Sequence, residues 1–310
     1  MGKSPVLLSG SAHPEFAQQI AEHLDTNLIN ATTGTFPDGE TQIEIHDNVR
    51  KKDVFLIQPF AKPQDHHIME AAFMVDALRR ASAADITMVI PYFGYSRQDR
   101  KERPRVPISA KVVTDIFADK VDRIVSVDLH SHQQQGFSNL PHDHLYAANS
   151  IYKYLSGSIE DPVIVAPDTG AAKRVKGLAK KWDAPWAIID KDRLGAKKTE
   201  VATIVGESVK NRNAILLDDI ASTGGSLLEA AKALHQKGAK SIIAATVHPV
   251  LCSGAPKRIN KSNILDMLFV TDTLPKHWKS DKIETITIVP LVAEAIHRIN
   301  RGKSLGPLFK

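Results

Sequence analysis

Short runs of apolar, often β-branched residues alternate with helical patterns along most of the chain. Six of these runs have the length and composition of buried strands: residues 85–90, 123–128, 163–167, 186–190, 214–219 and 241–247. Between them apolar residues recur at helical spacing, as at Leu227, Ala231 and Leu234, and Gly238 is placed to end that helix. Strands that alternate with helices predict an α/β fold with mostly parallel sheets flanked by helices.

The length of the chain and a weak internal repeat predict its domain organisation. A chain of 310 residues exceeds the usual size of one domain, which predicts two. Each half contains a strand that ends in an acidic residue, followed by a loop and a helix. We expect an N-terminal domain over residues 1–146 and a C-terminal domain over 147–289, with the tail 290–310 packed back on the first domain.

Composition and charge narrow the class of protein only a little. A hydrophobic content of 43% is typical of a globular protein, and a net charge of +5 suits nucleic acid, anionic lipid and phosphorylated metabolites alike. Cys252 is the only cysteine, which excludes an internal disulfide. The N-terminus lacks the apolar stretch of a signal peptide, and no run approaches the roughly 20 apolar residues of a membrane span. We therefore expect a soluble, cytoplasmic protein that does not bind membranes.

The segment AILLDDIASTGGSLLEAAKAL, residues 214–234, joins a strand to a small-residue loop and an amphipathic helix. Loop amides and a helix N-terminus together form a cradle for phosphate. Asp218 and Asp219 stand where the vicinal hydroxyls of a sugar could bind while its terminal phosphate enters the loop. The loop residues are Ser222, Thr223, Gly224, Gly225 and Ser226. The pattern predicts a site for a phosphorylated pentose; the alternative is a simple helix N-cap.

Two other predicted strands also end in acidic residues. In VSVDLHSH, Asp128 and His130 would project to the same side of a strand and converge on a divalent metal or on metal-bound phosphate. Because Mg²⁺ prefers oxygen ligands, His130 could contact nucleotide phosphates instead of the ion. Asp168, in APDTGAAKR, ends a strand where open α/β sheets bind ligands, and one of Lys173 and Arg174 would face that site. The alternative is that these acids only cap turns.

Three further loops carry charged or aromatic residues. Residues 95–107 carry five basic residues, and because arginine binds phosphate and stacks on purines, we interpret this loop as a lid or clamp. A nucleic-acid arm is the alternative. In the loop over residues 188–200, Lys191 and Arg193 are placed to bring positive charge to a developing phosphate charge, but the residues alone favour a solvated hairpin. Residues 35–45 predict a turn centred on Asp-Gly and nothing more.

Taken together and in this order, these motifs resemble those of the ribose-phosphate diphosphokinases, also called phosphoribosyl pyrophosphate synthetases. The segments that carry the resemblance are PYFGYSRQDRKERPRVPISAKVV, VDLHSHQQQGF, APDTGAAKR and LLDDIASTGGS. The resemblance implies two phosphoribosyltransferase-like domains. It also implies transfer of the diphosphoryl group of ATP to the 1-hydroxyl of ribose 5-phosphate, giving phosphoribosyl diphosphate and AMP for nucleotide biosynthesis. Mg²⁺ as cofactor and a homo-oligomer built from dimers, commonly a hexamer, are further implications.

The resemblance assigns roles to individual residues. It places ribose 5-phosphate at Asp218, Asp219 and the loop 222–226, and it places Lys191 and Arg193 in the catalytic loop whose cations stabilise the transition state. The positions that match those near the metal and the phosphates are Asp128, His130 and Asp168. The positions that match the ATP site are Phe36, Asp38, Glu40, Arg97, Gln98, Lys101 and His130. Of these, the first three reach the adenine site of a neighbouring subunit in the family.

Some positions depart from the family pattern, and three other classes of protein share part of it. Ser222 replaces an aspartate of the widespread form, and His144 replaces an asparagine at a regulatory position, so the response to phosphate and ADP stays open. A phosphoribosyltransferase would share the acid pair and loop but would need one such domain and no segment 91–107. A non-catalytic subunit of the same family would have lost loop residues that are present here. A nucleic-acid-binding module would carry a continuous basic stripe, so no nucleic-acid partner is expected.

Overall fold

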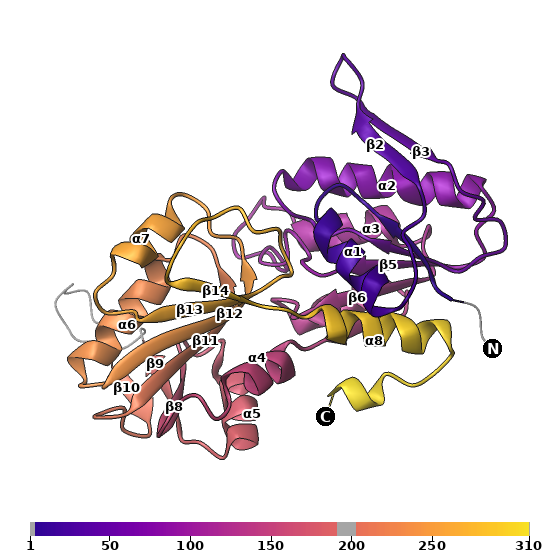
Figure 1. Ribbon diagram of the computed structural model, residues 1–310. Coiled ribbons are helices and arrows are strands. Elements are labelled where there is room, and N and C mark those ends of the chain that lie inside the picture. Colours follow the sequence, from indigo (N-terminus) through magenta and orange to yellow (C-terminus); the bar gives the residue numbers. More distant parts are fainter. Residues whose placement is uncertain (1–3, 191–202, 310) are drawn as a thin grey trace. The chain divides into compact units, whose positions relative to one another are not determined.

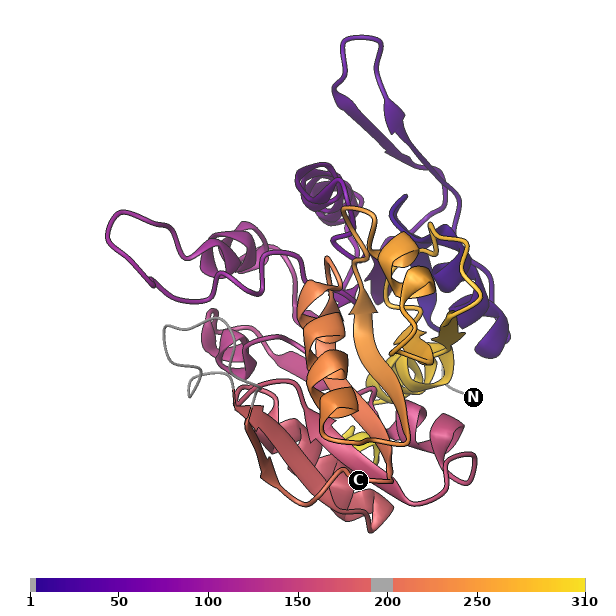
Figure 2. The same ribbon diagram turned by 90° about the vertical axis from the view of Figure 1, so that its left-hand side faces the viewer.

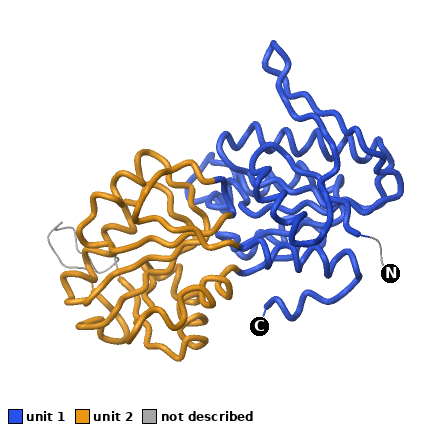
Figure 3. Tube along the Cα trace, viewed as in Figure 1, with its two compact units in different colours: residues 1–146, 273–275, 288–310 blue, residues 147–272, 276–287 orange. Residues whose placement is uncertain are grey.

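The computed structural model describes residues 4–190 and 203–309. The chain divides into two compact units, shown in Figure 3. Unit 1 comprises residues 1–146, 273–275 and 288–310, and unit 2 comprises residues 147–272 and 276–287. Each unit is built around one mainly parallel sheet (Figure 1). Within the described ranges, no helix has the length and apolar character needed to cross a membrane.

Unit 1 contains a five-stranded parallel sheet with strand order β1-β4-β5-β6-β7. Its strands are β1 (Val6–Ser9), β4 (Val54–Ile57), β5 (Ile86–Ile90), β6 (Arg123–Val127) and β7 (His142–Leu145). The helices α2 (Gln64–Arg80) and α3 (Ser109–Phe117) bury their apolar faces in one core cluster with this sheet. The helices α1 (Pro14–His23) and α8 (Val289–Asn300) pack against each other. Unit 1 also contains two short 3₁₀ helices, η1 (His132–Gly136) and η2 (Gly306–Phe309).

An antiparallel hairpin extends away from the sheet of unit 1. It consists of β2 (Ala31–Thr35) and β3 (Thr41–Ile45), and its projection is visible from both directions in Figures 1 and 2. The base of the hairpin contacts α2. At its tip Gly39 has a φ of +96°, a conformation that favours glycine, so the predicted Asp-Gly turn is confirmed.

Unit 2 contains a seven-stranded sheet with strand order β10-β9-β8-β11-β12-β13-β14. All neighbours are parallel except β10, which runs antiparallel to β9 at one edge. The strands are β8 (Pro162–Ala166), β9 (Trp186–Asp190), β10 (Thr203–Gly206), β11 (Asn213–Ala221), β12 (Ser241–Pro249), β13 (Met267–Thr271) and β14 (Ile283–Ile286). The helices are α4 (Ala148–Leu155), α5 (Ala172–Trp182), α6 (Gly225–Gln236) and α7 (Ala255–Lys261). Side chains of α6 and α7 share one core cluster with the sheet, while α4 and α5 contact each other.

The six predicted strands are all present, and with them the predicted mostly parallel α/β architecture. Strand β5 is buried along its whole length, as expected for a parallel strand covered on both faces. Several strand ends differ from the prediction by one or two residues, and two of these differences concern the candidate site. Strand β11 continues to Ala221, which carries the acid pair inside the strand, and β6 ends at Val127, one residue earlier than expected.

Candidate active site

The acid pair lies near the carboxyl end of β11, between β8 and β12 in the sheet of unit 2. Asp219 is only 5% exposed, and its backbone N–H donates to Oδ1 of Asp218 at 2.9 Å. Burial, together with the adjacent negative charge of Asp219, raises the pKa of Asp218 to about 7. At neutral pH the pair is therefore poised between one negative charge and two. Such a pair readily accepts hydrogen bonds from hydroxyl groups.

A cation from the neighbouring strand–helix connection faces this pair. Nη1 of Arg174, in the first turn of α5, lies 3.7 Å from Oδ1 of Asp219, whereas the adjacent Lys173 is exposed. The sequence predicted that one of these two residues would turn to the strand end at Asp168 and the other to solvent; the structure turns Arg174 toward Asp219 of the neighbouring strand and leaves Lys173 exposed. Asp168 precedes them at the end of β8, where its Oδ1 accepts the N–H of Ala171 at 3.1 Å. Asp168 is itself exposed, so its carboxylate caps the turn and still reaches solvent.

The loop after β11 presents unoccupied backbone donors. Gly224 has a φ of +77°, in the left-handed region that favours glycine, and α6 begins at the next residue. The N–H of Gly225 donates to Oγ1 of Thr223 at 3.4 Å. Across the described ranges, the N–H groups of Thr223, Gly224 and Ser226 donate to no acceptor. With the positive end of the α6 dipole beside them, these donors form a cradle for an anion.

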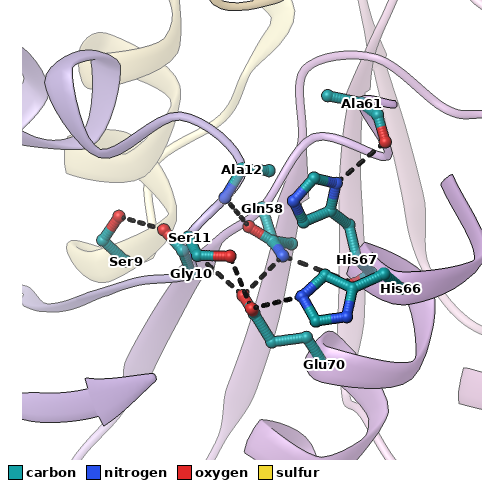
Figure 4. A network of polar contacts seen from close by, with 9 residues as sticks. All are labelled: Ser9, Gly10, Ser11, Ala12, Gln58, Ala61, His66, His67 and Glu70. Carbon is teal, nitrogen blue, oxygen red and sulfur yellow. Dashed lines mark hydrogen bonds and ion pairs between the residues drawn. The ribbon is translucent and has the colours of Figure 1, made fainter. Parts of the chain in front are cut away.

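A loop of unit 1, also at the carboxyl end of a strand, has its donors already filled (Figure 4). After β1, the N–H of Ser11 donates to Oε1 of Glu70 at 2.7 Å and the N–H of Ala12 donates to Oε1 of Gln58 at 3.1 Å. Glu70 is 1% exposed and also accepts from Nε2 of Gln58 at 2.8 Å. The packing is tight, because a Cβ on Gly10 would lie 2.2 Å from Oε1 of Gln58. Two backbone donors of this loop are therefore engaged by side chains of the protein itself.

The segment after β6 differs from the expectation. Because β6 ends at Val127 and Asp128 has a φ of +39°, Asp128 and His130 do not follow one extended strand. Asp128 is buried, whereas His130 is exposed. The prediction that they project to the same side of a strand is therefore wrong. Within residues 4–190 and 203–309, no three His, Cys, Asp or Glu side chains gather in a group that could hold a metal ion.

The predicted nucleotide-binding segments both belong to unit 1. The basic loop connects β5 to α3, and Gln98 anchors it there, because its Oε1 accepts from Oγ of Ser109 at 2.7 Å and its carbonyl accepts from the N–H of Ala110 at 3.2 Å. Arg97 and Lys101 are exposed.

At the hairpin tip, Phe36 is 45% exposed and its N–H donates to the carbonyl of Glu40 at 2.8 Å. Oδ1 of Asp38 accepts from the N–H of Glu40 at 3.2 Å. The tip therefore offers an aromatic ring and two acids to an external partner.

Lys191 and Arg193, the two predicted catalytic residues, lie outside the described residues. The strand β9 ends at Asp190, directly before them, two positions from β11 in the sheet.

One residue beside the loop was not predicted. Nη2 of Arg258, on α7, donates to the carbonyl of Thr223 at 2.5 Å. The sequence gives no signal for this contact, because the two residues are 35 positions apart and form no known motif.

Comparisons with known proteins agree with this arrangement. Residues 5–139 match the family model for the N-terminal domain of ribose phosphate pyrophosphokinase, and residues 187–310 match that of the phosphoribosyl synthetase-associated domain. The chain is 45% identical over 305 residues to the ribose-phosphate pyrophosphokinase of Helicobacter pylori, covering 98% of this chain and 95% of that protein. The chain belongs to the ribose-phosphate pyrophosphokinase family. The enzyme of that name from Coxiella burnetii is 46% identical over 312 residues, covering 98% of this chain and 97% of that protein.

A solved structure extends the likeness to the fold. The crystal structure of phosphoribosylpyrophosphate synthetase from Mycobacterium smegmatis matches with a TM-score of 0.88 and 36% identity, covering 97% of this chain and 100% of that one. These comparisons confirm the family that the four sequence motifs indicated. They also confirm the predicted fold class.

Proposed function

We propose that this chain transfers the diphosphoryl group of ATP to the 1-hydroxyl of ribose 5-phosphate, and that the acid pair and loop of unit 2 hold the sugar phosphate. The observation that carries this assignment is the pairing of two adjacent carboxylates, Asp219 buried and Asp218 half-buried, with a run of loop amides that have no acceptor among the described residues, on one strand–loop–helix connection. Carboxylates accept hydrogen bonds from sugar hydroxyls, and free amides at a helix N-terminus bind phosphate.

The reaction needs positioning and charge neutralisation more than covalent catalysis. The 1-hydroxyl oxygen attacks the β-phosphorus of ATP, the bond from that phosphorus to the α–β bridging oxygen breaks, and AMP leaves. The hydroxyl proton passes to solvent. Asp218 and Asp219 orient the ribose ring through its vicinal hydroxyls, and residues 222–226 fix its 5-phosphate. Arg174, whose Nη1 lies 3.7 Å from Oδ1 of Asp219, lowers the pKa of Asp218 and so offsets part of the repulsion within the pair.

The donor nucleotide is assigned to residues of unit 1. Arg97, Gln98 and Lys101 are proposed to bind ATP, supported by the exposure of the two cations and the anchoring of the loop to α3. His130, which is exposed, is proposed to contact the phosphates.

Phe36, Asp38 and Glu40 are proposed to reach the adenine of a neighbouring subunit, which would make the active enzyme a homo-oligomer. Support comes from the projection of the hairpin from its sheet and the exposure of the Phe36 ring.

Mg²⁺ is proposed as the metal, and its candidate ligands are Asp128 and His130 of unit 1 and Asp168 of unit 2. When bound, the ion would neutralise phosphate charge and hold the triphosphate in one geometry. Carboxylate oxygens are ligands that Mg²⁺ prefers, and the ion usually takes one or two of them and completes its shell with water and substrate phosphates. The carboxylate of Asp168 is exposed and could supply one such oxygen.

Lys191 and Arg193 are proposed to stabilise the charge that develops on the transferred group. The single cysteine is consistent with a reducing cytoplasm as the compartment.

The test is AMP release from ATP, Mg²⁺ and ribose 5-phosphate. We expect AMP only when the sugar phosphate is present; its absence under all conditions would instead support a non-catalytic subunit of the family. Adding inorganic phosphate in parallel shows whether phosphate activates this enzyme.

The role of the acid pair is tested by Asp219→Asn. The variant should raise the KM for ribose 5-phosphate by about tenfold and change the KM for ATP less than about twofold, because one charge-assisted hydrogen bond contributes on the order of 1.5 kcal/mol. Equal losses for both substrates would contradict a ribose-specific acid.

A further inference from the structure

Arg258 joins the two loops that follow β11 and β12. Its Nη2 donates to the carbonyl of Thr223 at 2.5 Å, and its Nη1 donates to the carbonyl of Ser253 at 2.7 Å. The guanidinium group presents its donors in a rigid planar fork and keeps its charge at any working pH. It therefore holds both carbonyls in a fixed relation.

The contact with Thr223 fixes the direction of a donor on the opposite side of the same peptide. The carbonyl of Thr223 and the N–H of Gly224 belong to one planar trans peptide, so they point in opposite directions. Because the carbonyl points to Arg258, the N–H of Gly224 points away from α7, and it has no acceptor among the described residues. If this peptide turned over, its carbonyl dipole would face the bound phosphate and repel it.

The packing of α7 against the loop reinforces this orientation. A Cβ on Gly224 would lie 3.6 Å from Cβ of Ala255 and 3.7 Å from Cδ1 of Ile259, and both of those residues are fully buried. The N–H of Cys252 donates to the carbonyl of Ser222 at 3.1 Å. The loop thus rests on an apolar surface of α7, and Arg258 supplies the polar contact at the point where the peptide could turn.

The charge of Arg258 is not neutralised by an acid. In the described part of the chain no carboxylate lies within 4 Å of its guanidinium nitrogens, and its hydrogen-bond partners there are two backbone carbonyls. An uncompensated positive charge behind the loop raises the electrostatic potential where an anion binds.

We propose that Arg258 is a positioning residue for the 5-phosphate of the sugar substrate. It does not touch the substrate; it holds the Thr223–Gly224 peptide so that the Gly224 N–H faces the phosphate, and it adds positive potential from behind. The inference rests on the proposed assignment of loop 222–226 to ribose 5-phosphate. It implies that loss of Arg258 weakens binding of the sugar phosphate selectively, without a matching effect on ATP.

The test compares three variants by steady-state AMP release. Arg258→Ala removes both contacts, Arg258→Lys keeps the charge without the fork, and Arg212→Ala is the matched control. Arg212 is also in unit 2 and forms a hydrogen-bonded ion pair with Asp161, with 2.6 Å between Nη2 and Oδ1. It directly precedes β11, at the end of the strand opposite the loop, so its loss should leave both KM values unchanged.

We expect Arg258→Ala to raise the KM for ribose 5-phosphate about tenfold, with the KM for ATP and kcat changed less than about threefold. Arg258→Lys should fall in between, because a lysine cannot donate to both carbonyls in the same geometry. Added guanidinium at millimolar concentration should lower the raised KM of Arg258→Ala and leave the wild type and Arg212→Ala unaffected. This rescue and the split between the two KM values are not expected of a residue that only stabilises the fold.

Equal increases in both KM values, or no increase, would overturn the inference. If Arg258→Ala does not fold, Arg258→Lys serves for the same test. Its KM for ribose 5-phosphate should rise by more than its KM for ATP. Asp219→Asn, measured in parallel, separates the two proposals. A raised KM for ribose 5-phosphate in Asp219→Asn with an unchanged value in Arg258→Ala rejects the role of Arg258 alone. An unchanged KM in both variants rejects the assignment of the loop itself.

Discussion

Replacing Asp218 by asparagine should stabilise the folded protein at pH 8 while it impairs the binding of ribose 5-phosphate. The reason is the position of the carboxyl group, which is largely buried and adjacent to Asp219, so that its pKa rises from 3.8 to about 7. In the unfolded chain the group ionises near 3.8. Folding at pH 8 therefore places a second negative charge beside Asp219, and an amide of nearly the same shape avoids this cost.

The magnitude and the pH window follow from the two pKa values. A rise from 3.8 to about 7 corresponds to about 4 kcal/mol against the ionised form, since each pH unit is worth about 1.4 kcal/mol. This is an upper limit, because Asp218 is partly exposed and solvent screens the repulsion. We expect a gain of about 1–3 kcal/mol in the free energy of unfolding at pH 8. Below pH 3.8 both states are protonated and the gain vanishes; it grows between pH 4 and pH 7 and is constant above.

The assay is urea denaturation of wild type and Asp218→Asn at pH 5, 6, 7 and 8, with the KM for ribose 5-phosphate measured at pH 8. Asp161→Asn is the control of opposite sign, because the hydrogen bond from Arg212 lowers the pKa of Asp161. That variant should lose stability equally from pH 5 to pH 8. If Asp218→Asn is no more stable than wild type at pH 8, or if its advantage is the same at pH 5 and pH 8, the account of the acid pair is refuted.

Two other substitutions probe features away from the pair. Lys191→Ala should lower kcat by several orders of magnitude with little change in the binding of ribose 5-phosphate, because a cation on the transferred group acts in the transition state. Single-turnover AMP release and a separate binding measurement check this. Lost binding with intact turnover would contradict it. Glu70→Ala should lower the free energy of unfolding by about 2–4 kcal/mol, because it leaves the Ser11 amide and the Gln58 side chain without their buried acceptor. Urea denaturation measures this loss, and an unchanged midpoint with a raised KM for ribose 5-phosphate would argue against a structural role.

The strands that could be predicted from the sequence are those with long apolar runs. Strand β5 and the first half of β11 are buried on both faces. Because nearly every residue of such a strand must be apolar, the strand is visible in the sequence as a continuous apolar segment. The strands β1, β4, β7, β10 and β14 have four residues each, too few to show a period. The sheet orders could not be predicted either, because they depend on contacts between distant segments.

The candidate site shows the same division between local and distant information. Asp218 and Asp219 could be placed because a strand, an acid pair and a small-residue loop are contiguous in the sequence. Asp128 was misplaced because the end of a strand depends on one backbone angle, a φ of +39°, that composition does not reveal. The choice between Lys173 and Arg174 needed the observed rotation of α5. Arg258 could not be found at all, since its partner is a backbone carbonyl 35 residues away.

The two units use supporting side chains of opposite charge at loops that follow parallel strands. In unit 1 the carboxylate of Glu70 accepts the loop N–H of Ser11 and the side-chain amide oxygen of Gln58 accepts that of Ala12, so these two donors are already engaged within the protein. In unit 2 the guanidinium of Arg258 binds the carbonyl of Thr223, so the carbonyl faces away from the site and the amides stay available. A shared strand–loop–helix pattern therefore does not make a phosphate site by itself. A loop can bind an anion when neighbouring side chains engage the carbonyl groups of its peptides. It cannot do so when they engage the N–H groups.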